Sequence, residues 1–156
     1  MPDMLVKLYD LPSLDDACAA VAKDGVTIRR AIAPEKPVVL DWVRANFASW
    51  VSEVECAFAH VPVRCFIATR DGAMLGFACH DVTCVNFFGP EGVASSERGK
   101  GVGRALLLAA LHAQRAAGYA YSIIGGAGPA QFYANTVAAV PIAGSTPGIY
   151  LQTLRD

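Results

Sequence analysis

Hydrophobic and polar residues follow two different periods along this chain, and each change of period marks a boundary between expected elements. Branched residues at alternate positions predict a strand over residues 26–32. Two short apolar runs, 65–69 and 74–78, predict a hairpin, because Asp71-Gly72 between them suits a tight turn. The first half of the chain therefore predicts mostly antiparallel strands.

Apolar residues at helical spacing are found in three longer segments. The first covers residues 14–22, and the second covers about 38–59 with a break near Ala48-Ser49. The third, 102–117, is apolar over most of its surface, so we expect it to lie buried against a sheet. Gly118 is well placed to end it, because glycine readily takes the left-handed conformation that often follows a helix.

The second half of the chain alternates strands and helices. An apolar segment over 82–93 contains Pro90, which has no N–H for a ladder and predicts a bulge or a strand end. The later elements expected are a strand over 119–124, a short helix beginning at Pro129, and strands near Val140 and over 149–154. A strand, a crossover helix and a second strand predict a parallel pair. The chain thus predicts a mixed α/β domain with one sheet, mostly antiparallel.

A length of 156 residues fits one domain. We expect residues 1–156 to form it, with residues 1–25 as an N-terminal extension of unassigned role. The net charge of −1, from 13 basic and 14 acidic residues, disfavours a general nucleic-acid binder. No apolar stretch approaches the roughly 20 residues of a membrane-spanning helix. The first residues lack the basic and apolar regions of a signal peptide.

Five cysteines, an odd number without a C-x-x-C pair, favour a reduced, cytoplasmic setting over a disulfide framework. Cys79, His80 and Cys84 are close enough in sequence to raise the question of a metal site. We expect no metal there, because tetrahedral zinc sites usually need a second ligand pair. A buried free cysteine in an apolar strand is also common.

The segment Arg98-Gly99-Lys100-Gly101-Val102-Gly103-Arg104 stands between an expected strand and an expected helix. Its glycines let the backbone approach a ligand and turn successive N–H groups toward it. The start of the helix adds unpaired N–H groups and a partial positive charge, and the three basic side chains add full charges. The segment therefore predicts a pyrophosphate site. The alternative is a plain glycine-rich turn with solvated basic residues.

Two common phosphate-binding patterns do not fit this segment. A Walker A loop requires Ser or Thr after Gly-Lys, where this chain has Gly101. A dinucleotide fingerprint requires a third glycine, where this chain has Leu106. A third pattern, [R/Q]-x-x-G-x-[G/A], is matched by Arg98, Gly101 and Gly103. With this pattern the sequence resembles the GNAT superfamily, the GCN5-related N-acetyltransferases.

The resemblance extends from Val93 through the long helix and the 119–124 strand to Phe132-Tyr133, which is similar to a Phe-Tyr signature of that family. It departs from the family at Gly126, where Asn is often found. The resemblance implies a GNAT-like fold, with a mixed sheet flanked by helices. It also implies transfer of an acetyl group from acetyl-CoA to a primary amine of a small molecule or peptide, by direct attack in a ternary complex.

The implied partners are acetyl-CoA and the amine acceptor, with no nucleic acid and no membrane, and the resemblance is compatible with a homodimer. It places the CoA on the strand end and the glycine loop, at Gly92, Val93, Arg98, Gly99, Lys100, Gly101, Val102, Gly103 and Arg104. The alternative function is a non-catalytic acyl-CoA-binding module that acts as a sensor or an interaction partner.

Two proton transfers must accompany the reaction that the resemblance implies. Tyr133 is the expected acid for the departing thiolate, because an ordinary tyrosine pKa of about 10 lies above the roughly 8.5 of a cysteine-like thiol. The alternative for Tyr133 is a core aromatic with a bonded hydroxyl. Glu91 is the expected base, acting through a water, with a solvated loop carboxylate as the alternative, and His80, for which a structural role is the alternative, and Asp81 are the other candidates. Phe87, Phe88 and Trp50 are candidates for the lining of an acceptor pocket, and the alternative for each is a plain core residue.

Overall fold

One mixed sheet organises residues 1–154, which are the residues that the computed structural model describes. Its strands lie in the order β2-β3-β4-β5-β6-β1-β7, and every neighbouring pair is antiparallel except β5 and β6. The strands are β1 (Met4–Lys7), β2 (Thr27–Arg30), β3 (Cys65–Arg70), β4 (Ala73–His80), β5 (Phe87–Val93), β6 (Tyr121–Ile124) and β7 (Val140–Pro141). The predicted fold class and the predicted parallel pair are confirmed.

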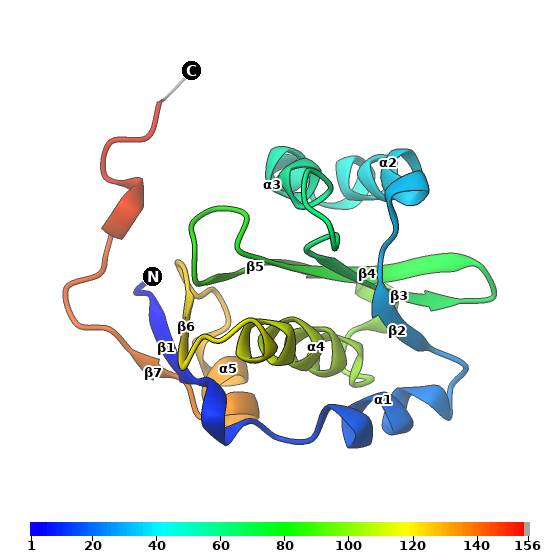
Figure 1. The fold of residues 1–156 in the computed structure, drawn as a ribbon, viewed down its shortest axis with the longest axis horizontal. Coiled ribbons are helices and arrows are strands. Elements are labelled where there is room, and N and C mark those ends of the chain that lie inside the picture. The colour runs from blue at the N-terminus through cyan, green and yellow to red at the C-terminus, as the bar shows by residue number, and fades with distance from the viewer. Residues whose placement is uncertain (155–156) are drawn as a thin grey trace.

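Helices cover both faces of the sheet (Figure 1). One face carries α2 (Lys36–Asn46) and α3 (Val51–Ala57), and the other carries α1 (Leu14–Ala22), α4 (Val102–Ala116) and α5 (Ala130–Val137). A separate cluster of buried apolar side chains lies on each face. The predicted break in the 38–59 region is confirmed, because a 3₁₀ turn at Ala48–Trp50 separates α2 from α3.

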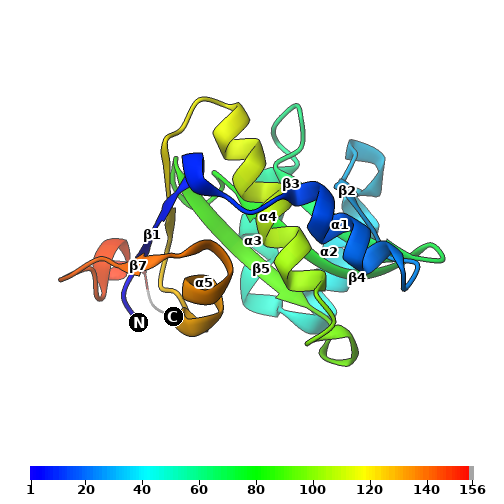
Figure 2. The same ribbon diagram turned by 90° about the horizontal axis from the view of Figure 1, so that it is seen from below.

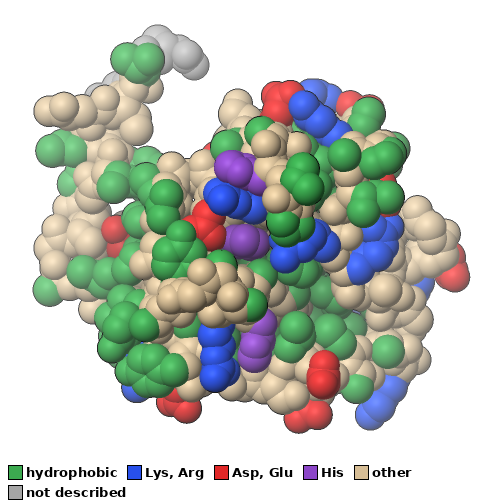
Figure 3. Space-filling view, in the orientation of Figure 1, with side chains coloured by type: hydrophobic (Ala, Val, Ile, Leu, Met, Phe, Trp, Pro, Cys, Tyr) green, Lys and Arg blue, Asp and Glu red, His purple; other side chains and the backbone are tan. Residues whose placement is uncertain are grey.

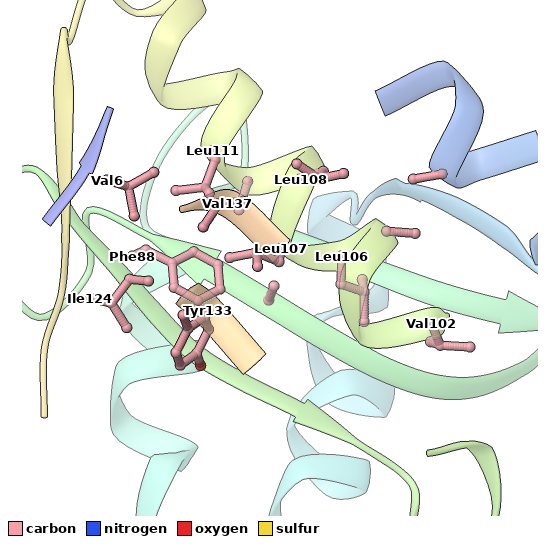
Figure 4. Packing of buried hydrophobic residues seen from close by; sticks show 14 of the residues in the cluster. Val6, Phe88, Val102, Leu106, Leu107, Leu108, Leu111, Ile124, Tyr133 and Val137 are labelled. Atoms are coloured by element: carbon pink, nitrogen blue, oxygen red, sulfur yellow. The ribbon is translucent and has the colours of Figure 1, made fainter. Parts of the chain in front are cut away.

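Helix α4 forms the centre of the larger cluster. Figure 2 shows it running across the sheet beside α1, and Figure 4 shows Leu107 pointing toward Phe88 of β5 and Leu111 lying toward Val137 of α5. Leu106, Leu107, Leu108 and Leu111 have no exposed surface. Each buried leucine contributes roughly 1.5–3 kcal/mol to stability. Gly118 follows the helix at a φ of +104°, as its place in the sequence predicts.

Strands β5 and β6 pair over only two positions, Phe87 with Ile123 and Phe88 with Ile124. Beyond Phe88 the two strands diverge, and the β6-facing edge of residues 89–93 has no partner strand. Strand β5 is shorter than the expected 82–93 segment, because residues 81–86 form a loop in which the Asn86 N–H donates to Asp81 Oδ1 at 2.6 Å. This divergence opens the sheet at the position of the site.

Residues 1–25 belong to the fold, which corrects the expectation that they form an extension. Strand β1 lies between β6 and β7, pairing Met4 with Ile124 and with Pro141. Helix α1 packs on α4. The strand β1 has only four residues, which is too short for a period of two to be recognised in the sequence. Its place in the sheet is set by partners more than a hundred residues away, which no local pattern predicts.

The strand expected over 149–154 is wrong. A 3₁₀ turn at Gly148–Tyr150 stands there instead, and Leu151 and Leu154 are exposed. No layer of the protein packs against these side chains, so their apolar character does not produce a strand. Within residues 1–154, no helix combines the length and the apolarity that crossing a membrane requires.

Candidate functional site

A cavity of about 1,020 Å³ opens where β5 and β6 diverge. It receives side chains or backbone from β5, the glycine loop, α3, the start of α5 and the C-terminal segment. Nine of the eleven residues predicted for catalysis and CoA binding line it, namely Glu91, Gly92, Val93, Arg98, Gly99, Gly101, Gly103, Arg104 and Tyr133, and so do the acceptor-pocket candidates Trp50, Phe87 and Phe88. Lys100 and Val102 do not line it. The fold thus brings most of the predicted residues together around one space.

One wall of the cavity, which we call the α4 wall, consists of residues 91–104. Gly99 and Gly101 have φ values of +73° and +88°, a conformation that suits glycine. Gly101 is also the residue before α4, and no side chain caps the helix there. The first N–H groups of α4 are therefore without intrahelical partners at a point where the helix dipole is positive. Helix starts of this kind are suited to anions, and to phosphates in particular.

The basic side chains of the loop differ in direction. The Arg98 Nε donates to the Val93 carbonyl at 3.2 Å, and Arg98 and Arg104 both line the cavity. The Lys100 Nζ instead lies 3.6 Å from Glu97 Oε2, outside the cavity lining. Glu97 is buried and accepts from Arg70 at 2.7 Å, so this ion pair ties the loop to the end of β3. Two cations, rather than the three expected, face the cavity.

Strand β5 has a bulge in its pairing with β4. Ala78 of β4 pairs with Glu91 and His80 pairs with Phe88, so two steps on β4 match three steps on β5. The extra residue lies at Gly89-Pro90, where the sequence predicted a bulge. The bulge brings Glu91 to the same face as Phe88, the face covered by α4. The Ala94 N–H bonds to Leu75 of β4, so by alternation the Val93 N–H points to the open edge.

Glu91 carries a carboxyl without a partner. Its Oε1 atom is out of contact with solvent and accepts no hydrogen bond from the described residues. A Cβ built on Gly103 would lie 3.4 Å from this oxygen, so the carboxyl lies against the first turn of α4. Burial raises the pKa of the Glu91 carboxyl well above its ordinary value. Such a carboxyl holds its proton more strongly than an exposed one and becomes a stronger base once ionised.

Tyr133 lies on α5, with 8% of its surface exposed. Its ring packs edge-on against Phe88, with centroids 6.2 Å apart, and Figure 4 shows its hydroxyl pointing away from the leucines of α4. The hydroxyl makes no hydrogen bond to any residue described by the structure. Burial, and then the neighbouring Glu91, raise the pKa of Tyr133. The hydroxyl is therefore protonated at neutral pH and free to donate into the cavity.

The opposite wall, which we call the α3 wall, consists of Phe47, Trp50, Glu53, Thr83 and Tyr150. The rings of Phe47 and Trp50 stack with centroids 5.2 Å apart. The Thr83 hydroxyl donates to Glu53 Oε1. Of these residues the sequence nominated only Trp50. Phe47 and Glu53 lie three residues on either side of Trp50, but Thr83 and Tyr150 come from distant segments, and no spacing in the sequence connects them with the other three.

The other two candidates for the base lie away from the cavity. His80 Nδ1 and Asp81 Oδ2 are 2.7 Å apart, and Gln114 donates to the same oxygen at 3.4 Å. This buried network lies at the C-terminal end of α4, beside a smaller cavity of about 220 Å³. Figure 3 shows histidine and Lys or Arg side chains gathered on one face of the molecule. Among residues 1–154, no group of three His, Cys, Asp or Glu side chains could hold a metal ion.

No protein-family model matches the sequence, and no curated protein matches it. Solved structures match the fold. The GCN5-related glucosamine N-acetyltransferase region of a fungal multi-domain GH3 beta-N-acetylglucosaminidase has a TM-score of 0.75 at 16% identity, over 90% of this chain and 19% of that one. A GCN5-related N-acetyltransferase from Sphaerobacter thermophilus has a TM-score of 0.70 at 16% identity, over 90% and 48%.

A third match, a GCN5-related N-acetyltransferase from Kribbella flavida, has a TM-score of 0.53 at 17% identity, over 90% of this chain and 53% of that one. The chain thus spans about half or less of each of these structures. These likenesses confirm the GNAT fold that the sequence resemblance implied.

Proposed function

We propose that this protein is an N-acetyltransferase that transfers the acetyl group of acetyl-CoA to a primary amine. The observation that carries the proposal is that residues 89–104 combine an unpaired strand edge, a cationic glycine loop and an uncapped helix start along one cavity. An extended thioester with a diphosphate at one end matches that wall in shape and charge. The fold shared with N-acetyltransferases supports the same conclusion.

Each part of the α4 wall has a role in this proposal. Val93 binds the pantetheine arm through its backbone groups on the open edge of β5, and Gly92, whose own backbone groups point to β4, lines the arm without a side chain in the way. The pyrophosphate binds the loop, where Gly99, Gly101 and Gly103 allow close approach and Arg98 and Arg104 supply charge. Val102 contributes through its backbone N–H alone, because its side chain is buried. Lys100 acts at longer range, because it faces Glu97.

The reaction begins when an acceptor ammonium loses one proton and its nitrogen attacks the thioester carbon. A C–N bond forms, the C–S bond breaks, the nitrogen loses a second proton, and the thiolate gains one. The products are an amide, free CoA and one proton released to solvent. Holding the amine and the thioester side by side supplies much of the acceleration, and the Val93 N–H polarises the carbonyl.

Tyr133 is the proposed acid for the thiolate. Its raised pKa keeps the hydroxyl protonated, and its hydroxyl has no partner that competes for the proton. Glu91 is the proposed base, acting through a water, because its carboxyl is unpaired and basic. The fraction of ionised Glu91 grows as pH rises toward its raised pKa, so we expect turnover to increase with pH over that range.

The second candidate, an acyl-CoA-binding module without catalysis, would have no use for an unbonded tyrosine hydroxyl beside the open strand edge. We therefore favour the enzyme. We place it in the cytoplasm, because all five cysteines are free, including Cys65 and Cys79, which pair across β3 and β4.

The test of the function is a screen of primary amines for release of free CoA from acetyl-CoA. We expect at least one amine to be acetylated, with the amide detected by mass spectrometry. Acetyl-CoA binding without amide formation from any amine would support the binding module instead. Absence of acetyl-CoA binding would overturn both.

A further inference from the structure

The two walls of the cavity carry opposite charge. Arg98 and Arg104 are the cationic side chains that line it, and both belong to the α4 wall. On the α3 wall, Glu53 is the one side chain with a formal charge among the described residues. The α4 wall also contains Glu91, whose raised pKa favours the uncharged carboxyl, so a ligand that spans the cavity meets net positive charge near α4 and negative charge near α3.

Glu53 is held in place without being neutralised. Thr83 donates to Glu53 Oε1, and the second carboxylate oxygen has no hydrogen-bond partner or ion pair within residues 1–154. Tyr150 approaches from the C-terminal segment, where burial, and then the nearby Glu53, raise the pKa of its hydroxyl. Three segments of the chain thus converge on one carboxylate that keeps a free oxygen.

Beside this carboxylate stands a flat aromatic surface. Phe47 and Trp50 are stacked at an interplanar angle of 18°, and Trp50 precedes Glu53 by one helical turn. Phe47 lies directly over β5, because a Cβ on Gly92 would come within 2.6 Å of its ring. The aromatic pair is therefore next to the strand edge that is proposed to hold the thioester. A carboxylate beside aromatic rings recognises an organic cation with an apolar, flat body.

We propose that the acceptor is a small monoamine with an aromatic body and no acidic group, whose ammonium is bound by Glu53. This rests on the proposed function, and it narrows the acceptor from any primary amine to one class. An α-amino acid of the same shape is disfavoured, because its carboxylate would lie beside Glu53 while both arginines face the pyrophosphate. Like charges brought together in this way cost several kcal/mol.

The proposal is tested by measuring the binding of amines, without the need for turnover. Calorimetry on the CoA-saturated protein compares 2-phenylethylamine with phenylalanine, which differs by one carboxylate, and with glucosamine, an amine without an aromatic body. We expect 2-phenylethylamine to bind at least tenfold more tightly than either. Equal or tighter binding of phenylalanine or glucosamine, or no binding of 2-phenylethylamine, would overturn the proposal.

The matched variants are Glu53→Gln and Glu55→Gln. Gln keeps the oxygen that accepts from Thr83 and removes the charge, so we expect Glu53→Gln to weaken 2-phenylethylamine about 10- to 100-fold and leave acetyl-CoA affinity unchanged. Glu55 lies on the same helix but pairs with Lys36 at 2.9 Å outside the cavity, so Glu55→Gln should bind as the wild type does. Unchanged amine affinity in Glu53→Gln overturns the inference.

Failure of this inference and failure of the proposed function give different results. If CoA binds and 2-phenylethylamine does not, the acceptor class is wrong and the acetyltransferase proposal stands. If 2-phenylethylamine binds through Glu53 but is never acetylated, the recognition is supported and the transfer is wrong.

Discussion

The α4 wall and the α3 wall face each other across one cavity, but one is a continuous segment of the chain and the other is assembled from distant segments. The α4 wall is a single run of fourteen residues, 91–104, whose glycine backbone, helix start and two arginines form the proposed binding surface. The α3 wall takes side chains from three segments spread from Phe47 to Tyr150. The proposed common ligand is thus bound by local backbone geometry, and the proposed acceptor by side chains that only the fold assembles.

Among the variants considered, Gly101→Glu in the α4 wall should cause the largest loss of acetyl-CoA affinity. The new carboxylate stands among the N–H groups proposed to bind the pyrophosphate, and juxtaposed like charges cost several kcal/mol, so acetyl-CoA affinity should fall about 1,000-fold. Calorimetry measures the loss. Gly118→Glu is the control, because it places the same residue at a positive φ at the other end of α4. Equal CoA affinity in both folded variants contradicts the loop assignment.

Tyr133→Phe should lower turnover without changing acetyl-CoA affinity. The ring and its contact with Phe88 remain, so acetyl-CoA affinity should change little. Turnover should fall about 10- to 1,000-fold, the range expected for loss of a general acid. The loss should shrink above about pH 8.5, where a free thiolate is already an acceptable leaving group. Steady-state kinetics with a working acceptor test this, and wild-type turnover at pH 7 would reduce Tyr133 to a packing residue.

Glu91→Gln should stabilise the protein in a pH-dependent way. The pKa of Glu91 is raised in the folded protein, so the unfolded chain loses this proton first, and the stability of the wild type falls as pH rises above about 4.3. A glutamine side chain does not titrate, so the variant does not lose stability in this way as pH rises. We expect no gain at pH 4 and a gain of about 1–2 kcal/mol at pH 7, the size expected for an unpaired buried polar group. Urea unfolding at both pH values measures it, with Glu55→Gln as an exposed control. A loss of stability at pH 7 would show that the carboxylate is stabilised in the fold.

Arg104→Ala and Lys100→Ala should differ by a small but measurable amount. Arg104 lines the cavity, and its loss should weaken acetyl-CoA about tenfold, equivalent to about 1.4 kcal/mol. Lys100 faces Glu97, so its loss should weaken acetyl-CoA less than about threefold, in the range of a surface ion pair. The opposite order would mean that Lys100 leaves Glu97 to contact the ligand.

The contrast between the walls also explains what the sequence could predict. The glycine loop, α4, the hairpin at Asp71-Gly72 and the parallel pair follow from local spacing and from the handedness of crossovers. The place of β1 could not be predicted, because its pairing depends on partners at the other end of the chain. Glu53, Thr83 and Tyr150 carry no local signal, since each becomes part of the α3 wall only through tertiary packing. The direction of Lys100 depends on Glu97, whose burial the sequence does not reveal.

The pairing of β1 has a consequence for how the protein is made. Residues 4–7 are synthesised well before their partners in β6 and β7, which emerge only after residue 120. A nascent chain that stops at Gly118 already contains β2 to β5 and all of the α4 wall, yet its first strand has no neighbour. The hydrogen bonds from the Gly126 N–H to Asp3 and from the Asp3 N–H to Ser145, both 2.7 Å, can form only once residues 126 and 145 have been synthesised. The far end of the cavity is therefore completed only after residues 121–150 have been synthesised and have met β1.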